Sequence, residues 1–249
     1  SLVDTVGFQY TFILTSSVIA LATLIVVLGI KEVVLNEKGS RKKHYSRKEV
    51  IRLVFQSKLI LAVRIISFFI QTANFSIQPL LALYVDELTT TANLAFVAGL
   101  AFSITGLGNL LSTRSCGNLG DRIGHGKVLI ICLLLAVIFF IPQAFVTNIW
   151  QLIFLRLLYG IQVGGLIPCM TAYIRQLAPI SIQGEVLGYN QSFRFLGNVA
   201  GPVMGGILAG FFGISFVFFF GASLFLIGFV ILYFALKHDQ SMMEEENHT

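Results

Sequence analysis

Charged residues are scarce in this chain, and acidic residues are missing from its apolar segments. Asp, Glu, Lys and Arg make up 12% of the 249 residues, against 56% for hydrophobic residues. None of the twelve acidic residues stands in the middle of a long apolar run. A chain with this composition is not a soluble globule.

Signatures of enzymes, metal sites and disulfide frameworks are also lacking. There is no nucleotide-binding glycine loop, no HExxH, no catalytic-triad pattern and no CxxC. Cys116, Cys132 and Cys169 are odd in number and lack metal-ligand spacing, so we interpret them as small apolar residues. We therefore expect no enzyme activity, no cofactor and no metal.

What the chain does contain is apolar runs long enough to cross a bilayer core, which takes roughly 20 helical residues. Spanning helices satisfy their own backbone groups, whereas a closed barrel needs alternating strands that this sequence does not show. The sequence therefore predicts an all-α membrane protein with seven transmembrane helices, at Phe8–Ile30, Leu59–Val85, Leu94–Leu111, Val128–Val146, Ile149–Tyr173, Tyr189–Phe211 and Ile214–Leu236.

Lys and Arg gather in every second connector. More than half of the 17 lie in residues 31–58, and the connectors on the other side carry none. Because positive loops stay in the cytoplasm, we expect the start outside the cell membrane and the C-terminus inside. The basic loop could also contact anionic lipid, and the net charge of +5 needs no nucleic acid to explain it.

A weak internal repeat suggests how the helices are grouped. Val6–Lys31 matches Phe212–Lys237 at an offset of 206 residues, each with a glycine turn, an aromatic-rich helix and an exit lysine. With six spans per repeat, residues 1–30 end a first bundle, 31–58 link the bundles, 59–237 form a complete second bundle and 238–249 form an acidic cytoplasmic tail. The chain begins at Ser1 without a visible signal peptide, which indicates a fragment or a truncated product.

The connector after the third span holds Gly, Asp and Arg at close spacing, in residues 117–127. Gly120 and Gly124 permit close backbone approach. Asp121 is expected near the start of the next helix, where a carboxylate favours the dipole and the free N–H groups. Arg122 is expected to pair with a neighbouring helix end.

This connector resembles the cytoplasmic signature of the major facilitator superfamily, which joins the second and third helices of each half. The resemblance implies a fold of two six-helix bundles and a cytoplasmic gate that locks the halves together when the carrier opens outward. The gate residues would be Gly117, Asp121, Arg122, Gly124 and Lys127. Where the family usually continues with two basic residues, His125 and Gly126 stand here.

Two further stretches resemble the same family. Arg156 and Gly160 match an Arg-x-x-x-Gly element of the fourth helix of a half, and residues 197–206 are similar to the glycine-proline signature of drug antiporters. Glycines four apart share one helix face, which favours close packing, and Pro202 can kink the helix. Static packing and a moving hinge both fit the set Gly197, Gly201, Pro202, Gly205 and Gly206.

Polar residues inside the spans are candidates for a substrate cavity. In the family's fold, the first, second, fourth and fifth helices of a half face that cavity. Arg156 is either functional, part of a structural ion pair or snorkelling outward, whereas Arg64 and Arg194, near cytoplasmic ends, are expected to snorkel. The candidates are Gln71, Asn74, Gln78, Asn109, Arg156, Tyr159, Gln162 and Asn198.

The sequence favours secondary active transport of a small molecule, with closest resemblance to bacterial multidrug efflux members. The expected partners are the substrate, protons as coupling ion, the bilayer and the missing N-terminal half of the same carrier. Since this part has no intramembrane carboxylate, the coupling group would lie in that half. A seven-helix receptor and an inactive fragment remain alternatives.

Overall fold

The computed structural model describes residues 2–29, 58–89 and 94–247, without the side chains of 2–8, 11, 58 and 238–247. The predicted linker, apart from Lys58, lies outside the described residues. The chain divides into two units, residues 1–43 and 44–249, and each is treated by itself. The first unit contains α1 (Leu2–Gly29), whose described side chains are all exposed.

The second unit is a bundle of long helices. Its elements are α3 (Lys58–Ile77), α4 (Leu81–Leu88), α5 (Leu94–Ile123), α6 (His125–Phe140), η1 (Ile141–Phe145), α7 (Ile149–Leu177), η2 (Ile180–Ile182), α8 (Gln183–Phe212) and α9 (Ile214–Asn247). Seven helices of the described chain are long and apolar enough to cross a membrane, one in the first unit and six in the second. This confirms the predicted all-α fold with seven apolar spans.

The second predicted span, Leu59–Val85, is in fact interrupted. α3 ends at Ile77, and α4 begins at Leu81 after a turn closed by a hydrogen bond from Leu80 N–H to Ile77 O at 3.1 Å. Pro79 explains the break, because proline has no N–H and disfavours the helical conformation of the residue before it. The apolar run continues past the break, which is why hydropathy alone joined the two helices.

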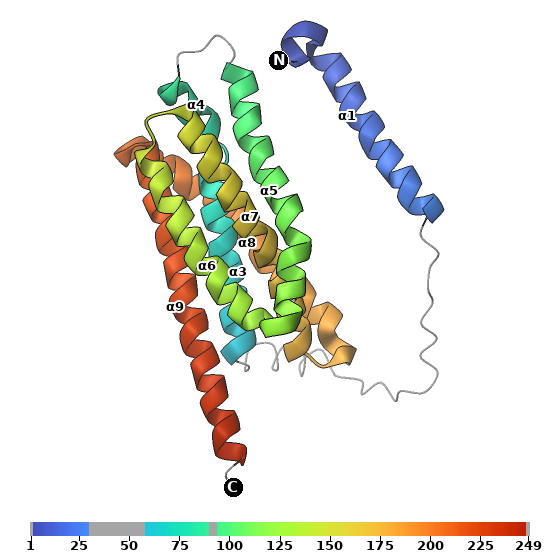
Figure 1. The fold of residues 1–249 in the computed structure, drawn as a ribbon, viewed down its shortest axis with the longest axis vertical. Coiled ribbons are helices and arrows are strands. Elements are labelled where there is room, and N and C mark those ends of the chain that lie inside the picture. The colour runs from blue at the N-terminus through green and yellow to red at the C-terminus, as the bar shows by residue number, and fades with distance from the viewer. Residues whose placement is uncertain (1, 30–57, 90–93, 248–249) are drawn as a thin grey trace. The chain divides into compact units, whose positions relative to one another are not determined.

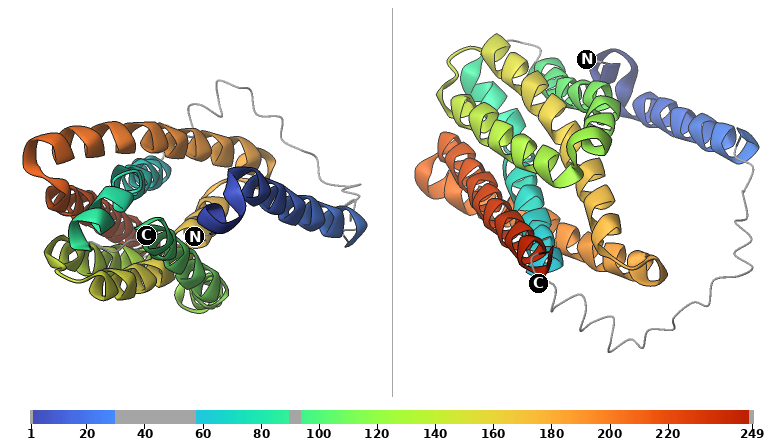
Figure 2. Two further views of the ribbon diagram at one scale, coloured as in Figure 1. Left: turned by 90° about the horizontal axis from the view of Figure 1, so that it is seen from above. Right: turned by 60° about the horizontal axis from the view of Figure 1, so that its bottom comes forward.

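The six long helices of the second unit pack one on the next, in an order that runs from α5 to α8 (Figures 1 and 2). α5 packs on α7, α7 on α6, α6 on α9, α9 on α3 and α3 on α8. An aromatic cluster stabilises the centre, where the Phe140 ring lies 5.1 Å from Tyr159 and 5.5 Å from both Phe218 and Phe225. The cluster joins α6, α7 and α9 and fixes the position of the Tyr159 side chain.

Glycine faces bring two helix pairs into close contact. On α8, Gly197, Gly201 and Gly205 are buried against α3, and a Cβ on Gly197 would lie 2.7 Å from Phe68 O. On α7, a Cβ on Gly160 would overlap Thr105 O of α5. Small residues allow this backbone approach in membrane proteins, where packing rather than water exclusion drives helix association.

The last predicted segment, residues 238–249, is helical over most of its length. α9 continues without interruption from Ile214 to Asn247, so residues 238–247 of the expected tail extend the final helix.

Candidate functional site

An open cavity of about 360 Å³ lies among α3, α5 and α7. Six of the eight predicted cavity residues line it, together with aromatic and aliphatic side chains that contribute an apolar surface. The lining residues are Gln71, Asn74, Phe75, Gln78, Phe102, Thr105, Gly106, Asn109, Arg156, Tyr159, Val163 and Ile167.

Helical periodicity explains why these side chains meet. Residues three and four apart share a helix face, as Gln71 and Asn74 do on α3, and Gln78 continues this spacing in the turn directly after the helix. On α5 the same spacing connects Phe102, Thr105, Gly106 and Asn109, but only Asn109 of this set was predicted as a site residue. In the sequence, the apolar lining residues look the same as lipid-facing ones. They could have been predicted only from their positions, three or four residues from a polar candidate on the same helix.

Arg156 is the charged residue of this cavity. Its side chain extends from α7, is 5% exposed and lies with its guanidinium carbon 5.8 Å from the centre of the Phe218 ring. Its Nε and Nη2 have no hydrogen-bond partner among the described residues. A buried cation without a partner is costly, so this side chain is not a simple structural ion pair within the part described.

Tyr159 connects α7 to α3 across the cavity. Its hydroxyl donates a hydrogen bond to Oδ1 of Asn74, while its ring packs in the aromatic cluster of Phe140 and Phe225. Because one end of the side chain is held in the core, the hydroxyl is fixed at the cavity wall.

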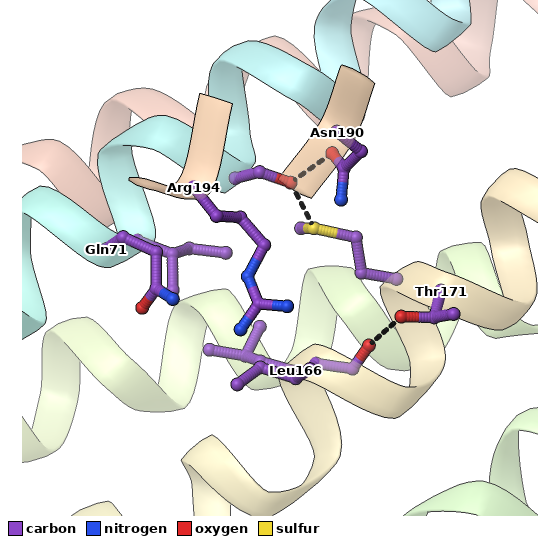
Figure 3. A pocket seen from close by; sticks show the side chains of 9 residues that line it. Gln71, Leu166, Thr171, Asn190 and Arg194 are labelled. Carbon is purple, nitrogen blue, oxygen red and sulfur yellow. Dashed lines mark hydrogen bonds between the residues drawn. The ribbon is translucent and has the colours of Figure 1, made fainter. Parts of the chain in front are cut away.

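Arg194 lies at a second, much smaller cavity that shares Gln71 with the first (Figure 3). Its Nη1 donates to Gln191 Oε1 at 2.9 Å. With the Gln71 amide oxygen facing it, that oxygen accepts from Nη2 at 3.1 Å and Nε at 3.2 Å. Asn190 lines the same space, where its Oδ1 accepts from Ser67 at 2.7 Å.

The expectation that Arg64 snorkels is wrong, whereas for Arg194 it stays a prediction. Arg64 is fully buried, with its guanidinium 4.6 Å from the Phe193 ring and 5.7 Å from the Tyr189 ring. Arg194 is partly buried and points toward Gln71 (Figure 3). Aromatic rings of α8 surround the Arg64 guanidinium in place of water, and amides of α8 and α3 bind Arg194.

Gln162 and Asn198 are not among the residues that line the cavity. Gln162 is 2% exposed, and neither its amide oxygen nor its nitrogen has a hydrogen-bond partner in the described chain. Asn198 Oδ1 is likewise buried without a described partner. Their assignment to the substrate cavity stays a prediction.

The predicted gate motif has a different local structure from the expected turn. Gly117, Asp121 and Arg122 belong to α5, which ends only at Ile123, and Gly124 is the single junction residue before α6. The prediction that Asp121 lies at a helix start is therefore wrong. Its Oδ1 instead lies 3.3 Å from Nε2 of His125, in the first turn of α6.

Two glycines shape this junction. Gly124 has φ +96°, a conformation that side-chain-bearing residues rarely adopt. At Gly120, a Cβ would overlap the buried His125 ring. The side chains of Arg122 and Lys127 are exposed, so they face outward from the junction. The gate role itself stays a prediction.

The remaining predicted packing residues divide into two groups. Gly197, Gly201 and Gly205 contact α3, whereas Gly206 faces open space. Pro202 stands inside α8, which continues through it to Phe212. The hinge role of this face stays a prediction.

No group of three or more His, Cys, Asp or Glu side chains that could hold a metal occurs in the described part of the chain. Cys116, Cys132 and Cys169 are free thiols. The site is thus a cavity lined by amides, aromatic rings and one arginine.

A bundle of membrane-length helices around a polar cavity has the architecture of a multi-pass membrane protein. The chain belongs to the Major Facilitator Superfamily, whose family model matches residues 65–248. It is 52% identical over 236 residues to the MFS-type transporter YuxJ of Bacillus subtilis (strain 168), covering 95% of this chain and 60% of that protein.

It is also 35% identical over 244 residues to Multidrug resistance protein MdtG of Salmonella typhi, covering 98% of this chain and 60% of that protein. The chain thus spans about 60% of the length of the curated relatives it matches. The family is one of transporters, and these comparisons lend the receptor alternative no support.

Proposed function

We propose that this chain forms part of a secondary active carrier that moves small molecules out of the cell by alternating access. The observation that carries the proposal is the open cavity among α3, α5 and α7, with polar side chains on three helices and an apolar lining between them. Such a mixture binds a compact organic molecule and fixes its orientation. Family membership supports transport, and the name of the MdtG relative, a multidrug resistance protein, supports drugs as substrates. Export is the direction that we propose, because removal of a drug from the cell would give resistance.

A second bundle completes the cavity in this proposal. Alternating access rocks two bundles around a midplane site, and the described part supplies the six long helices of one. We assign residues 1–30 to the last helix of the first bundle, 31–58 to the linker, 59–237 to the second bundle and 238–249 to a cytoplasmic tail. The match to only 60% of the relatives' length supports a further bundle outside these residues.

Proton coupling is the second part of the proposal. A proton-driven carrier needs a titratable group within the membrane, and no acidic side chain lines the cavity in the described residues. The coupling carboxylate is therefore placed in the other bundle. The isolated 249-residue chain is expected to insert but to drive no proton-linked efflux.

The test uses inside-out membrane vesicles that contain the full-length carrier. An imposed proton gradient should drive accumulation of at least one member of a panel of anionic, neutral and cationic fluorescent drugs, and a protonophore should abolish it. Vesicles with the 249-residue chain alone should accumulate none, and co-expression of the missing first half should restore accumulation. Gradient-driven accumulation by the chain alone would contradict the two-bundle assignment.

The proposed orientation in the cell membrane has a separate test. In a background lacking Cys116, Cys132 and Cys169, a cysteine at Thr90 should react with an impermeant thiol reagent from outside. A cysteine at Ser46 should react only after permeabilisation; both positions lie outside the described residues. Labelling of Ser46 in intact cells would reverse the assignment.

A further inference from the structure

The cavity wall presents an arginine with two donor nitrogens that the described part of the chain does not satisfy. Arg156 is 5% exposed and lines the cavity, and its Nε and Nη2 lack hydrogen-bond partners in the described chain. The cost of a buried unsatisfied charged group is high, so a group that enters beside it and accepts these hydrogen bonds gains affinity. The planar guanidinium fork fits carboxylate oxygens two at a time.

The other polar groups at this wall do not compensate the charge. They are the neutral side chains of Gln71, Asn74, Gln78, Thr105, Asn109 and Tyr159. The acidic side chains that the structure describes, Asp86, Glu87, Asp121 and Glu185, are all exposed and are absent from the lining.

Arg194 adds a second cation close to the same cavity. Gln71 lines both the large cavity and the small one beside Arg194 (Figure 3). The hydrogen-bond partners of Arg194, the Gln71 and Gln191 amides, are neutral. Two cations in a low-dielectric wall produce a positive potential that concentrates anions.

The lining also determines what the rest of a ligand is made of. Phe75, Phe102, Val163 and Ile167 give the cavity an apolar surface next to Arg156. An acid group at the guanidinium would leave an aromatic or aliphatic body against these side chains, where burial contributes about 25 cal/mol per Å² of apolar area.

We infer that this cavity binds amphipathic organic anions, with Arg156 as the residue that recognises the acid group. The inference rests on the proposed transport function and names its substrate class. A carboxylate from the other bundle could reach Arg156 instead, and in that case the cavity would show no preference for anions.

Binding to the purified full-length carrier in detergent tests the inference without requiring transport. The probes are 2-naphthoate and 2-naphthamide, which share one ring system and differ by a single charge. The wild type should bind the carboxylate at least tenfold more tightly in equilibrium dialysis. Arg156→Gln should remove this preference while retaining naphthamide binding, which also reports that the variant is folded, and Arg156→Lys should keep part of it.

Arg114→Gln removes an exposed cation of α5 outside the cavity and is the matched control, which should bind both probes as the wild type does. Equal affinity of the wild type for both probes, no binding of 2-naphthoate, or a full preference in Arg156→Gln would overturn the inference. Gradient-driven transport that shows no preference for anionic drugs would contradict this inference but not the proposed transport function. Selective binding of the anion without gradient-driven transport would contradict only the proposed transport function.

Discussion

The α5·α7 and α3·α8 helix pairs both pack through glycine, but they place it differently. In α5·α7 the glycines lie on both helices, with Gly108 on α5 and Gly160 and Gly164 on α7. In α3·α8 they lie on α8 alone, as Gly197, Gly201 and Gly205. Both arrangements let backbone atoms of neighbouring helices meet directly.

The two pairs also differ in what they do for the cavity. Both α5 and α7 contribute lining residues to the large cavity. α8 contributes none, but it packs against α3, which does line the cavity. α8 instead carries Asn190 and Arg194, which lie at the smaller cavity. A change in α5·α7 should therefore move two walls of the cavity, and a change in α3·α8 only one.

The largest loss of stability is expected from Gly160→Leu. Its Cβ would overlap the Thr105 carbonyl, a backbone atom that cannot rotate away, so the helices must separate. Overpacking of this kind costs about 3 kcal/mol, and thermal unfolding in detergent should occur well below the wild-type temperature. Gly99→Leu, on an α5 position with open space, is the control, and equal destabilisation by the two would show that the contact is not tight.

Gly205→Ala tests the other pair with a smaller side chain. Its Cβ would overlap Ser76 O of α3, so we expect a loss of about 2 kcal/mol in thermal stability. Gly206→Ala adds the same methyl group to the adjacent position, where nothing lies within 4 Å, and should be neutral or slightly stabilising. Naphthoate binding should survive Gly205→Ala better than Gly160→Ala, since only one wall moves.

Hydropathy was sufficient to predict the membrane helices, because bilayer thickness sets their length. It failed at Pro79, where the apolar run masks a break in the helix. It also failed at Arg64, whose aromatic partners Tyr189 and Phe193 are distant in sequence and are brought near only by the packing of α3 on α8.

The polar cavity residues were found because polar groups are rare in apolar helices, but their grouping needed the tertiary arrangement. Gln162 carries the same sequence signal as Tyr159, yet it is buried away from the lining. At the junction, glycines suggested a turn from residue 117 onward. α5 continues instead to Ile123, and the missing side chain of Gly120 leaves room for the His125 ring of α6.

Gly124 offers a contrast in which conformation rather than packing matters. A Cβ there meets nothing within 4 Å, but φ is +96°, so Gly124→Ala should cost about 1–2 kcal/mol through backbone strain alone. Gly117→Ala, inside α5 with open space at its Cβ, should be stabilising by up to about 1 kcal/mol. Chemical denaturation measures the free energy of unfolding of both variants. Equal values for Gly124→Ala and Gly117→Ala would show that the positive φ at residue 124 does not require glycine.

Asp121→Asn is expected to have the smallest effect on stability but to reduce transport. The carboxylate is exposed and lies beside the buried His125 ring, and a contact made by an exposed carboxylate contributes about 0.5 kcal/mol. Membrane abundance and thermal stability should therefore stay close to wild type. If Asp121 stabilises one conformation of the gate, gradient-driven transport by the full-length carrier should still fall. Asp86→Asn, which removes an exposed carboxylate of α4, is the control and should transport as the wild type does. A wild-type transport rate in Asp121→Asn would rule the gate role out.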